Sequence, residues 1–149
     1  MNDTISREIY IDAPPTAVWP IVTEPAHMAG WFSDEVDVDL RPGGPMLLTW
    51  HGHGTYRARV ETVEPPNTFA FRWMLRETDE ETEGASTLVV MTLLPQGNGT
   101  TLRVTESGFA ELPWPREERA RYSTENAKGW IVELDELRAY ASEATRPSA

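Results

Sequence analysis

The C-terminal stretch from Arg116 to Ala141, REERARYSTENAKGWIVELDELRAYA, decides the fold. It contains no proline, and its apolar residues recur at the spacing of one helical face. These residues are Ala120, Ala127, Trp130, Ile131, Leu134, Leu137 and Ala141. The pattern predicts a helix of roughly 39 Å, at about 1.5 Å per residue. For a chain of this size such a helix is long, so we expect much of the fold to lie along it.

Gly129 interrupts this helical pattern. A glycine in mid-helix costs about 1 kcal/mol relative to alanine. Because Gly129 stands beside Trp130 at the edge of the apolar stripe, we favour a close approach of strand backbone or of a ligand to the helix at this point. A tolerated surface glycine is the alternative.

The rest of the chain predicts strands and two short helices. Alternating residues predict a first strand over residues 5–11, followed by two helices, the first shortened by Pro20 and the second starting after Pro25. Further strands are expected over residues 35–40, 46–51, 55–63, 68–75, 88–94 and 100–107, and an acidic hairpin loop over 77–84. We therefore predict an α+β fold in which a curved antiparallel sheet of about six or seven strands wraps on the long C-terminal helix.

Length and composition predict a single domain. The 149 residues carry a net charge of -11, six tryptophans and no cysteine. We expect one domain over residues 1–149, with its core at about 5–141 and a loose tail over 142–149. The negative charge disfavours nucleic acid and membrane surfaces as partners. The chain shows no signal-peptide layout and no long apolar run, so a cytoplasmic location is expected.

Several short motifs occur in the order found in a known superfamily. The ordered set resembles the SRPBCC superfamily, whose helix-grip fold is shared with START lipid-transfer domains, Bet v-like birch-pollen allergens and polyketide cyclases. Within it, the chain resembles the branch related to the C-terminal domain of the activator of the heat-shock-protein-90 ATPase (AHSA-like). The motifs are Ile11-Asp12-Ala13-Pro14-Pro15-Thr16-Ala17-Val18-Trp19, Trp31-Phe32, Arg41-Pro42-Gly43-Gly44, Gly54-Thr55-Tyr56, Val63-Glu64-Pro65-Pro66, Phe71-Arg72-Trp73, Gly99-Thr100-Thr101-Leu102, Glu106-Ser107-Gly108-Phe109 and Gly129-Trp130.

The resemblance implies the helix-grip fold but does not select one function, because folds of this kind host carriers, cyclases and regulators. A stress-response role is one expectation that it carries. The resemblance leaves open whether the protein forms a homodimer and whether it binds a chaperone.

A gap between a curved sheet and one helix, lined by aromatic residues, predicts a binding pocket. Our first hypothesis is therefore a small-molecule binding protein for an apolar or amphipathic ligand, with no assigned catalysis. The alternatives are a cyclase or hydrolase that uses acid–base residues in the pocket, and a module that binds a chaperone or regulator. The predicted pocket residues are Trp31, Trp50, Phe71, Trp73, Met91, Glu106, Asn126 and Trp130.

Glu106 is the polar residue of greatest interest. It follows Leu102 and Val104 at period two, so the three share one face of a strand. If that face is the inner one, Glu106 either contacts the ligand or makes a structural hydrogen bond, with Asn126 and Tyr122 among its candidate partners. An arginine from the strands is a further candidate partner.

No catalytic residues, metal or cofactor are predicted. The chain has no Gly-x-Ser-x-Gly elbow and no thiol nucleophile. His27, His51 and His53 lack the spacing of a known zinc motif.

Overall fold

The computed structural model describes residues 4–52, 54–74 and 86–145. The predicted acidic loop over 77–84, the end of the strand predicted over 68–75, and His53 lie outside these residues. No helix within the described ranges is long and apolar enough to cross a membrane.

Seven strands form one antiparallel sheet in the order β1-β7-β6-β5-β4-β3-β2. They are β1 (Thr4–Ile11), β2 (Glu35–Val38), β3 (Pro45–Trp50), β4 (Gly54–Glu64), β5 (Thr68–Met74), β6 (Ser86–Gln96) and β7 (Gly99–Ser107). A register shift between Val60 and Thr62 interrupts the β4–β5 ladder, and such bulges bend a strand. β1 joins the far edge of the sheet by pairing with β7, the last strand in the sequence.

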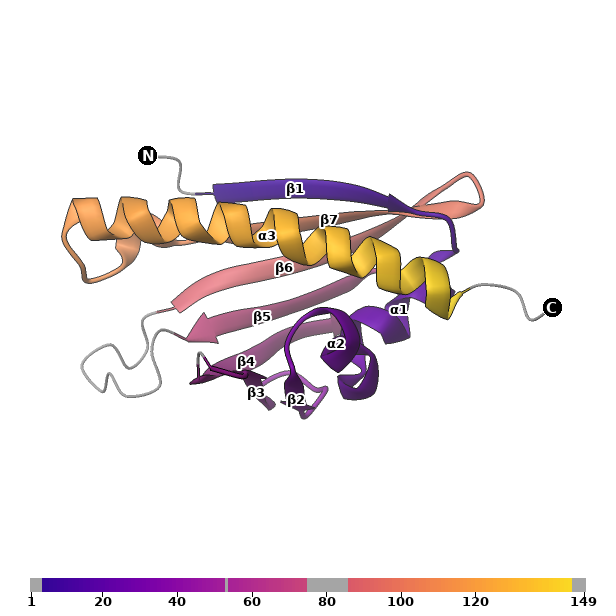
Figure 1. The fold of residues 1–149 in the computed structure, drawn as a ribbon, viewed down its shortest axis with the longest axis horizontal. Coiled ribbons are helices and arrows are strands. Elements are labelled where there is room, and N and C mark those ends of the chain that lie inside the picture. The colour runs from indigo at the N-terminus through magenta and orange to yellow at the C-terminus, as the bar shows by residue number, and fades with distance from the viewer. Residues whose placement is uncertain (1–3, 53, 75–85, 146–149) are drawn as a thin grey trace.

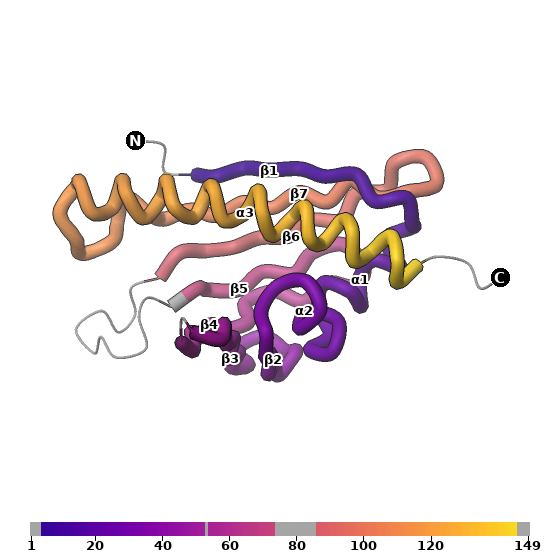
Figure 2. Tube along the Cα trace, in the orientation of Figure 1, coloured from indigo at the N-terminus to yellow at the C-terminus, as the bar shows by residue number. Residues whose placement is uncertain are grey.

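Helices cover one face of this sheet. The short helices α1 (Pro15–Thr23) and α2 (Pro25–Trp31) follow β1, and Pro20 lies inside the nine-residue α1. A 3-10 turn, η2 (Phe109–Glu111), leads from β7 toward α3 (Arg116–Ala144), which has 29 residues. Figures 1 and 2 show α3 running along the sheet beside β1, with α2 against its C-terminal part. The predicted helix-grip fold is confirmed.

The core forms where α3 meets the inner face of the sheet. Every second residue of β6 and β7 is buried, as period two predicts: Thr87, Val89, Met91 and Leu93 on β6, and Thr100, Leu102, Val104 and Glu106 on β7. Glu106 therefore shares the inner face with Leu102 and Val104.

The buried stripe of α3 is narrower than the sequence predicted. Trp130, Leu134, Leu137 and Ala141 are buried, whereas Ile131 is 49% exposed. At about 100° per residue, Ile131 lies roughly 90° from the centre of the buried stripe, beyond the part of the helix that faces the sheet. The assignment of Ile131 to the core was wrong.

α3 also extends beyond its predicted end. It continues to Ala144, so residues 142–144 belong to the helix and not to a loose tail, and residues 146–149 lie outside the described ranges. On its other side, Tyr140 bonds His27 of α2, with 2.8 Å between the phenol oxygen and Nδ1. Gly30 of α2 allows this contact, because a Cβ there would lie 2.3 Å from Cε2 of Tyr140.

Two alanine substitutions on α3 test this orientation. Leu137 is fully buried, so Leu137→Ala should lower the free energy of unfolding by about 2–5 kcal/mol. The control Ile131→Ala should cost about 1 kcal/mol at most, because half of that side chain already contacts water. Urea denaturation followed by circular dichroism measures both. Equal losses in the two variants would contradict the orientation of the helix.

Candidate functional site

A cavity of about 160 Å³ lies between the middle of α3 and the inner face of the sheet. Its α3 wall is formed by Glu125 and by four residues spaced i, i+3, i+4 and i+7 from Asn126, the spacing that places side chains on one flank of a helix. Two of these α3 residues, Glu125 and Gly129, are exposed, so the cavity opens to solvent along the helix. The residues lining the cavity are Phe32, Trp50, Trp73, Val89, Glu106, Glu125, Asn126, Gly129, Trp130 and Glu133.

Four rings, Phe32, Trp50, Trp73 and Trp130, form an aromatic wall around the cavity. Phe32 stacks on Trp130 with 5.8 Å between ring centroids, and Trp50 meets Phe32 edge-on at 5.5 Å. Trp50 and Trp73 are also edge-on, at 5.8 Å. Rings packed against one another in this way hold their positions before any ligand arrives.

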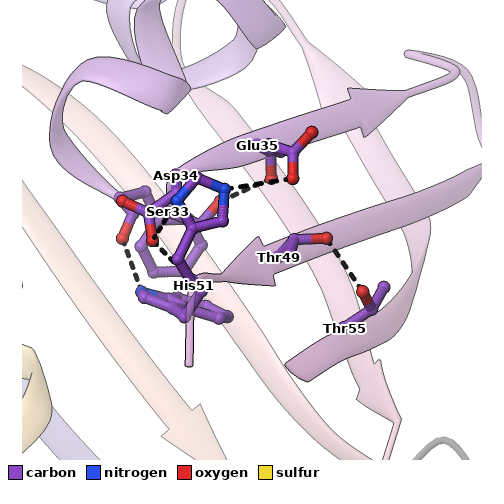
Figure 3. A network of polar contacts seen from close by, with 8 residues as sticks. Ser33, Asp34, Glu35, Thr49, His51 and Thr55 are labelled. Atoms are coloured by element: carbon purple, nitrogen blue, oxygen red, sulfur yellow. Dashed lines mark hydrogen bonds and ion pairs between the residues drawn. The ribbon is translucent and has the colours of Figure 1, made fainter. Parts of the chain in front are cut away.

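The segment that carries Phe32 is tied to the end of β3 by polar contacts (Figure 3). Asp34 accepts a hydrogen bond from the backbone N–H of His51 at 2.6 Å, and Glu35 lies 3.2 Å from Nε2 of the same histidine. The indole N–H of Trp50 donates to the carbonyl of Phe32 at 3.0 Å. These contacts fix two rings of the aromatic wall relative to each other. No cluster of potential metal ligands is found in the described part of the chain.

Glu106 connects the sheet to α3 from inside the cavity. Its carboxylate accepts hydrogen bonds from the Thr87 hydroxyl at 2.5 Å, from the Trp130 indole N–H at 2.9 Å and from the Asn126 amide at 3.0 and 3.2 Å. Glu106 is 2% exposed, and this burial raises its pKa, while the hydrogen bonds from these three side chains act in the opposite direction. Asn126 is thus one of the two partners suggested from the sequence. No arginine of the described residues bonds Glu106, and Arg72 pairs with Glu61 on the exposed surface.

Tyr122, the second suggested partner, lies close enough to Glu106 for the charge of that carboxylate to affect the pKa of the phenol. Burial, as the largest cause, and the negative charge of Glu106 together raise the pKa of Tyr122 to about 12, although a hydrogen bond with Asn126 acts in the opposite direction. A phenol with such a pKa stays protonated near neutral pH and cannot act as a general base there. No histidine is found among the described lining residues.

Glu133 is a second carboxyl group of the cavity and differs from Glu106. Its Oε2 atom is buried and has no hydrogen-bond partner among the described residues. Burial raises the pKa of Glu133 to about 8, and the charge of Glu136 contributes in the same direction. At neutral pH the group is therefore mostly protonated.

The structure places five of the eight predicted pocket residues around the cavity: Trp50, Trp73, Glu106, Asn126 and Trp130. The other three lie in the core behind it. Trp31 donates its indole N–H to the carbonyl of Ile21 at 2.8 Å, Phe71 packs between Phe69 and Trp73, and Met91 is fully buried on β6. The alternation of inward and outward side chains along the strands could not separate core residues from cavity residues, because both lie on the inner face of the sheet.

The surroundings of Gly129 differ from the close approach of strand backbone that was the first expectation. A Cβ built at this position meets no atom within 4 Å, so no strand backbone approaches the helix there. Gly129 instead lines the cavity. Glu133 was not predicted at all, although its position four residues after Gly129 and seven after Asn126 is a signal that could have found it.

Comparisons with known proteins agree with this architecture. Residues 12–142 match the profile of the family described as "Activator of Hsp90 ATPase homolog 1-like protein". The crystal structure of MLL2253 from Mesorhizobium loti has 25% sequence identity and a TM-score of 0.80, covering 97% of this chain and 99% of that one. No curated protein matches the sequence.

Two further similar structures differ in length and description. DynU16, from the dynemicin biosynthetic locus, has 25% identity and a TM-score of 0.75, covering 94% of this chain and 47% of the other. The solution structure of the Aha1 dimer from Colwellia psychrerythraea has 19% identity and a TM-score of 0.76, covering 96% and 98%. The Colwellia protein is informative for the fold alone.

Glu106→Gln tests whether the buried carboxylate is structural. Replacing a carboxylate that has three donors should lower the free energy of unfolding by about 1.5–3 kcal/mol, because hydrogen bonds to a charged group are weakened or lost. The matched control is Glu8→Gln, which removes an exposed carboxylate bonded to Arg103 and should cost at most about 1 kcal/mol. Urea denaturation measures both. A stable Glu106→Gln variant with impaired ligand binding would instead assign Glu106 to the ligand.

Glu133→Gln tests the raised pKa through the pH dependence of stability. The folded state, with a pKa of about 8 against the ordinary 4.5, binds more protons than the unfolded state between these values, so stability falls as pH rises through this window. The variant should therefore melt above wild type at pH 9 and match it at pH 5. Solvent screening limits the gain to about 1 kcal/mol, or roughly 2–4 °C in Tm. Glu117→Gln, on the exposed first turn of α3, should raise Tm at neither pH.

Proposed function

The chain belongs to the Activator of Hsp90 ATPase homolog 1-like family, and we propose that it binds a small apolar or amphipathic molecule in the cavity beneath α3. The observation that carries this proposal is the aromatic wall around an open cavity in the middle of the fold. Such concave, largely apolar sites with a few polar groups are where proteins bind small ligands.

The size of the cavity limits what enters it. An apolar cavity of about 150 Å³ in another protein binds benzene, so the volume of about 160 Å³ found here suits one ring or a short branched chain. A larger ligand would keep its remainder outside, along the exposed edge formed by Glu125 and Gly129.

Binding without catalysis is the function that the polar groups support. The carboxylate of Glu106 already accepts hydrogen bonds from three side chains of the protein. Among the described residues, no histidine lines the cavity. The similar protein DynU16 comes from a biosynthetic locus, which also favours a small-molecule ligand.

The interaction-module alternative has less support. It would require a contiguous apolar surface of a few hundred Å². The large exposed apolar side chains of the described residues are Tyr10, Leu40, Leu47, Ile131 and Val132, which are spread over β1, the β2–β3 hairpin and α3. Only Ile131 and Val132 are neighbours in the sequence.

Filling the cavity tests the proposal. Benzyl alcohol, a small neutral aromatic molecule, should change tryptophan emission in a saturable manner that depends little on salt, since apolar burial drives the binding. Gly129→Leu should weaken this binding about tenfold or more while keeping the protein folded, because the new side chain has open space to enter.

Ala139→Leu is the matched control. It adds bulk at an exposed position of α3 that does not line the cavity, so binding should be unchanged. If small aromatic compounds of every charge leave tryptophan emission and Tm unchanged in the wild-type protein, the proposed function is wrong.

A further inference from the structure

The charged residues of the cavity all have one sign. Glu106, Glu125 and Glu133 line it, and no lysine, arginine or histidine is found among the described lining residues. A ligand with a carboxylate or phosphate would therefore meet like charges in a partly desolvated space, which is unfavourable. A cationic ligand would meet opposite charges.

The three carboxyl groups are not equally available to a ligand. Glu106 is held by Thr87, Asn126 and Trp130. Glu133, in contrast, lines the same cavity and has one buried oxygen that no described residue bonds. A buried acceptor without a partner is costly, and a ligand cation beside it would lower this cost.

The aromatic wall provides a second attraction for a cation. Both faces of Phe32 are covered by Trp31 and Trp130. Trp130 has one face on Phe32 and Trp73 has one face on Tyr56, whereas Trp50 meets Phe32 and Trp73 edge-on, and all three indole rings line the cavity. Tryptophan is the side chain to which organic cations bind best through cation–π attraction, and cages of aromatic rings recognise quaternary ammonium groups.

We propose that the cavity selects small apolar molecules that carry one ammonium group, with the cation between Glu133 and the tryptophans of the aromatic wall. This inference rests on the proposed function and narrows it, since an amphipathic anion such as a fatty acid is disfavoured. The cavity volume suits a group no larger than one ring with its ammonium substituent.

A cation at this place must displace a proton. With its pKa raised to about 8, Glu133 is mostly protonated at pH 7, and a cation beside it favours the charged form. The other titratable groups near it are Glu136 and Glu125 on α3 and Glu106 on β7, all of them acids. Binding of a permanently charged ligand is therefore expected to release up to about one proton.

Isothermal titration calorimetry of the full chain at pH 7 tests the proposal with three probes of similar size. They are benzyltrimethylammonium, neutral benzyl alcohol and anionic phenylacetate. The cation should bind about tenfold more tightly than benzyl alcohol and phenylacetate more weakly than either. Titration of the cation in two buffers of different ionisation enthalpy should show the released proton.

Two variants distinguish a direct contact between Glu133 and the cation from a general effect of negative charge on α3. Glu133→Gln should weaken binding of benzyltrimethylammonium about tenfold, abolish the proton release and change the affinity for benzyl alcohol by a clearly smaller factor. Glu136→Gln removes the same charge one turn further along α3, outside the lining residues, and should change the affinity for the cation by less than about threefold. Melting curves confirm that both variants are folded.

Three results would overturn the selection of ammonium ligands. They are equal or tighter binding of the neutral or anionic probe, cation binding without proton release, and equal effects of the two variants. In the first case small-molecule binding itself would still stand. Failure of all three probes to bind would remove the proposed function together with this inference.

Discussion

The carboxylate of Glu106 is the interaction on which the arrangement of the site depends. It lies on the inner face of β7 and accepts hydrogen bonds from Thr87 on the neighbouring strand and from Asn126 and Trp130 on α3. A buried carboxylate that loses its hydrogen bonds costs free energy, so these donors are held in place once the fold has formed. One polar group thereby fixes both the height of α3 above the sheet and the angle at which the Trp130 ring enters the cavity.

The aromatic wall depends on the same constraint. Trp130 is held by its N–H at one edge and stacks on Phe32 with its ring, and Phe32 in turn contacts Trp50. The polar contacts of Asp34 and Glu35 with His51 hold the opposite end of this series. The cavity is thus enclosed by rings whose positions are set from both ends, and it persists because the side chains that could fill it are bonded elsewhere.

Much of the fold could be predicted from the sequence because it follows from periodicity and turn residues. The inner faces of β6 and β7 and the helix after Pro115 were predicted in this way. The residues of the site were predicted only in part. Phe71 and Met91 follow the same strand alternation as Trp73 and Val89, and Trp31 lies at the end of α2. Only packing in three dimensions decides which of them border empty space.

The errors on α3 have a common origin. Ile131 was assigned to the core and Glu133 was overlooked because hydrophobicity was used to define the inner side of the helix. Where a helix covers a cavity and not a packed core, that rule fails: an acid and a glycine can face inward, while an isoleucine faces water. Gly129 was recognised as unusual from the sequence, but the space beside it was not.

The spacing of the α3 lining residues has a consequence for how this protein can diverge. Half of the lining comes from one segment of nine residues, Glu125 to Glu133. The other half is Phe32, which follows α2, and four residues on strands whose side chains also build the sheet. Substitutions in that segment at positions such as Glu125, Gly129 and Glu133 alter the shape and charge of the cavity without disturbing strand pairing. Ligand preference can therefore diverge through substitutions in one short stretch of helix, while the scaffold is kept.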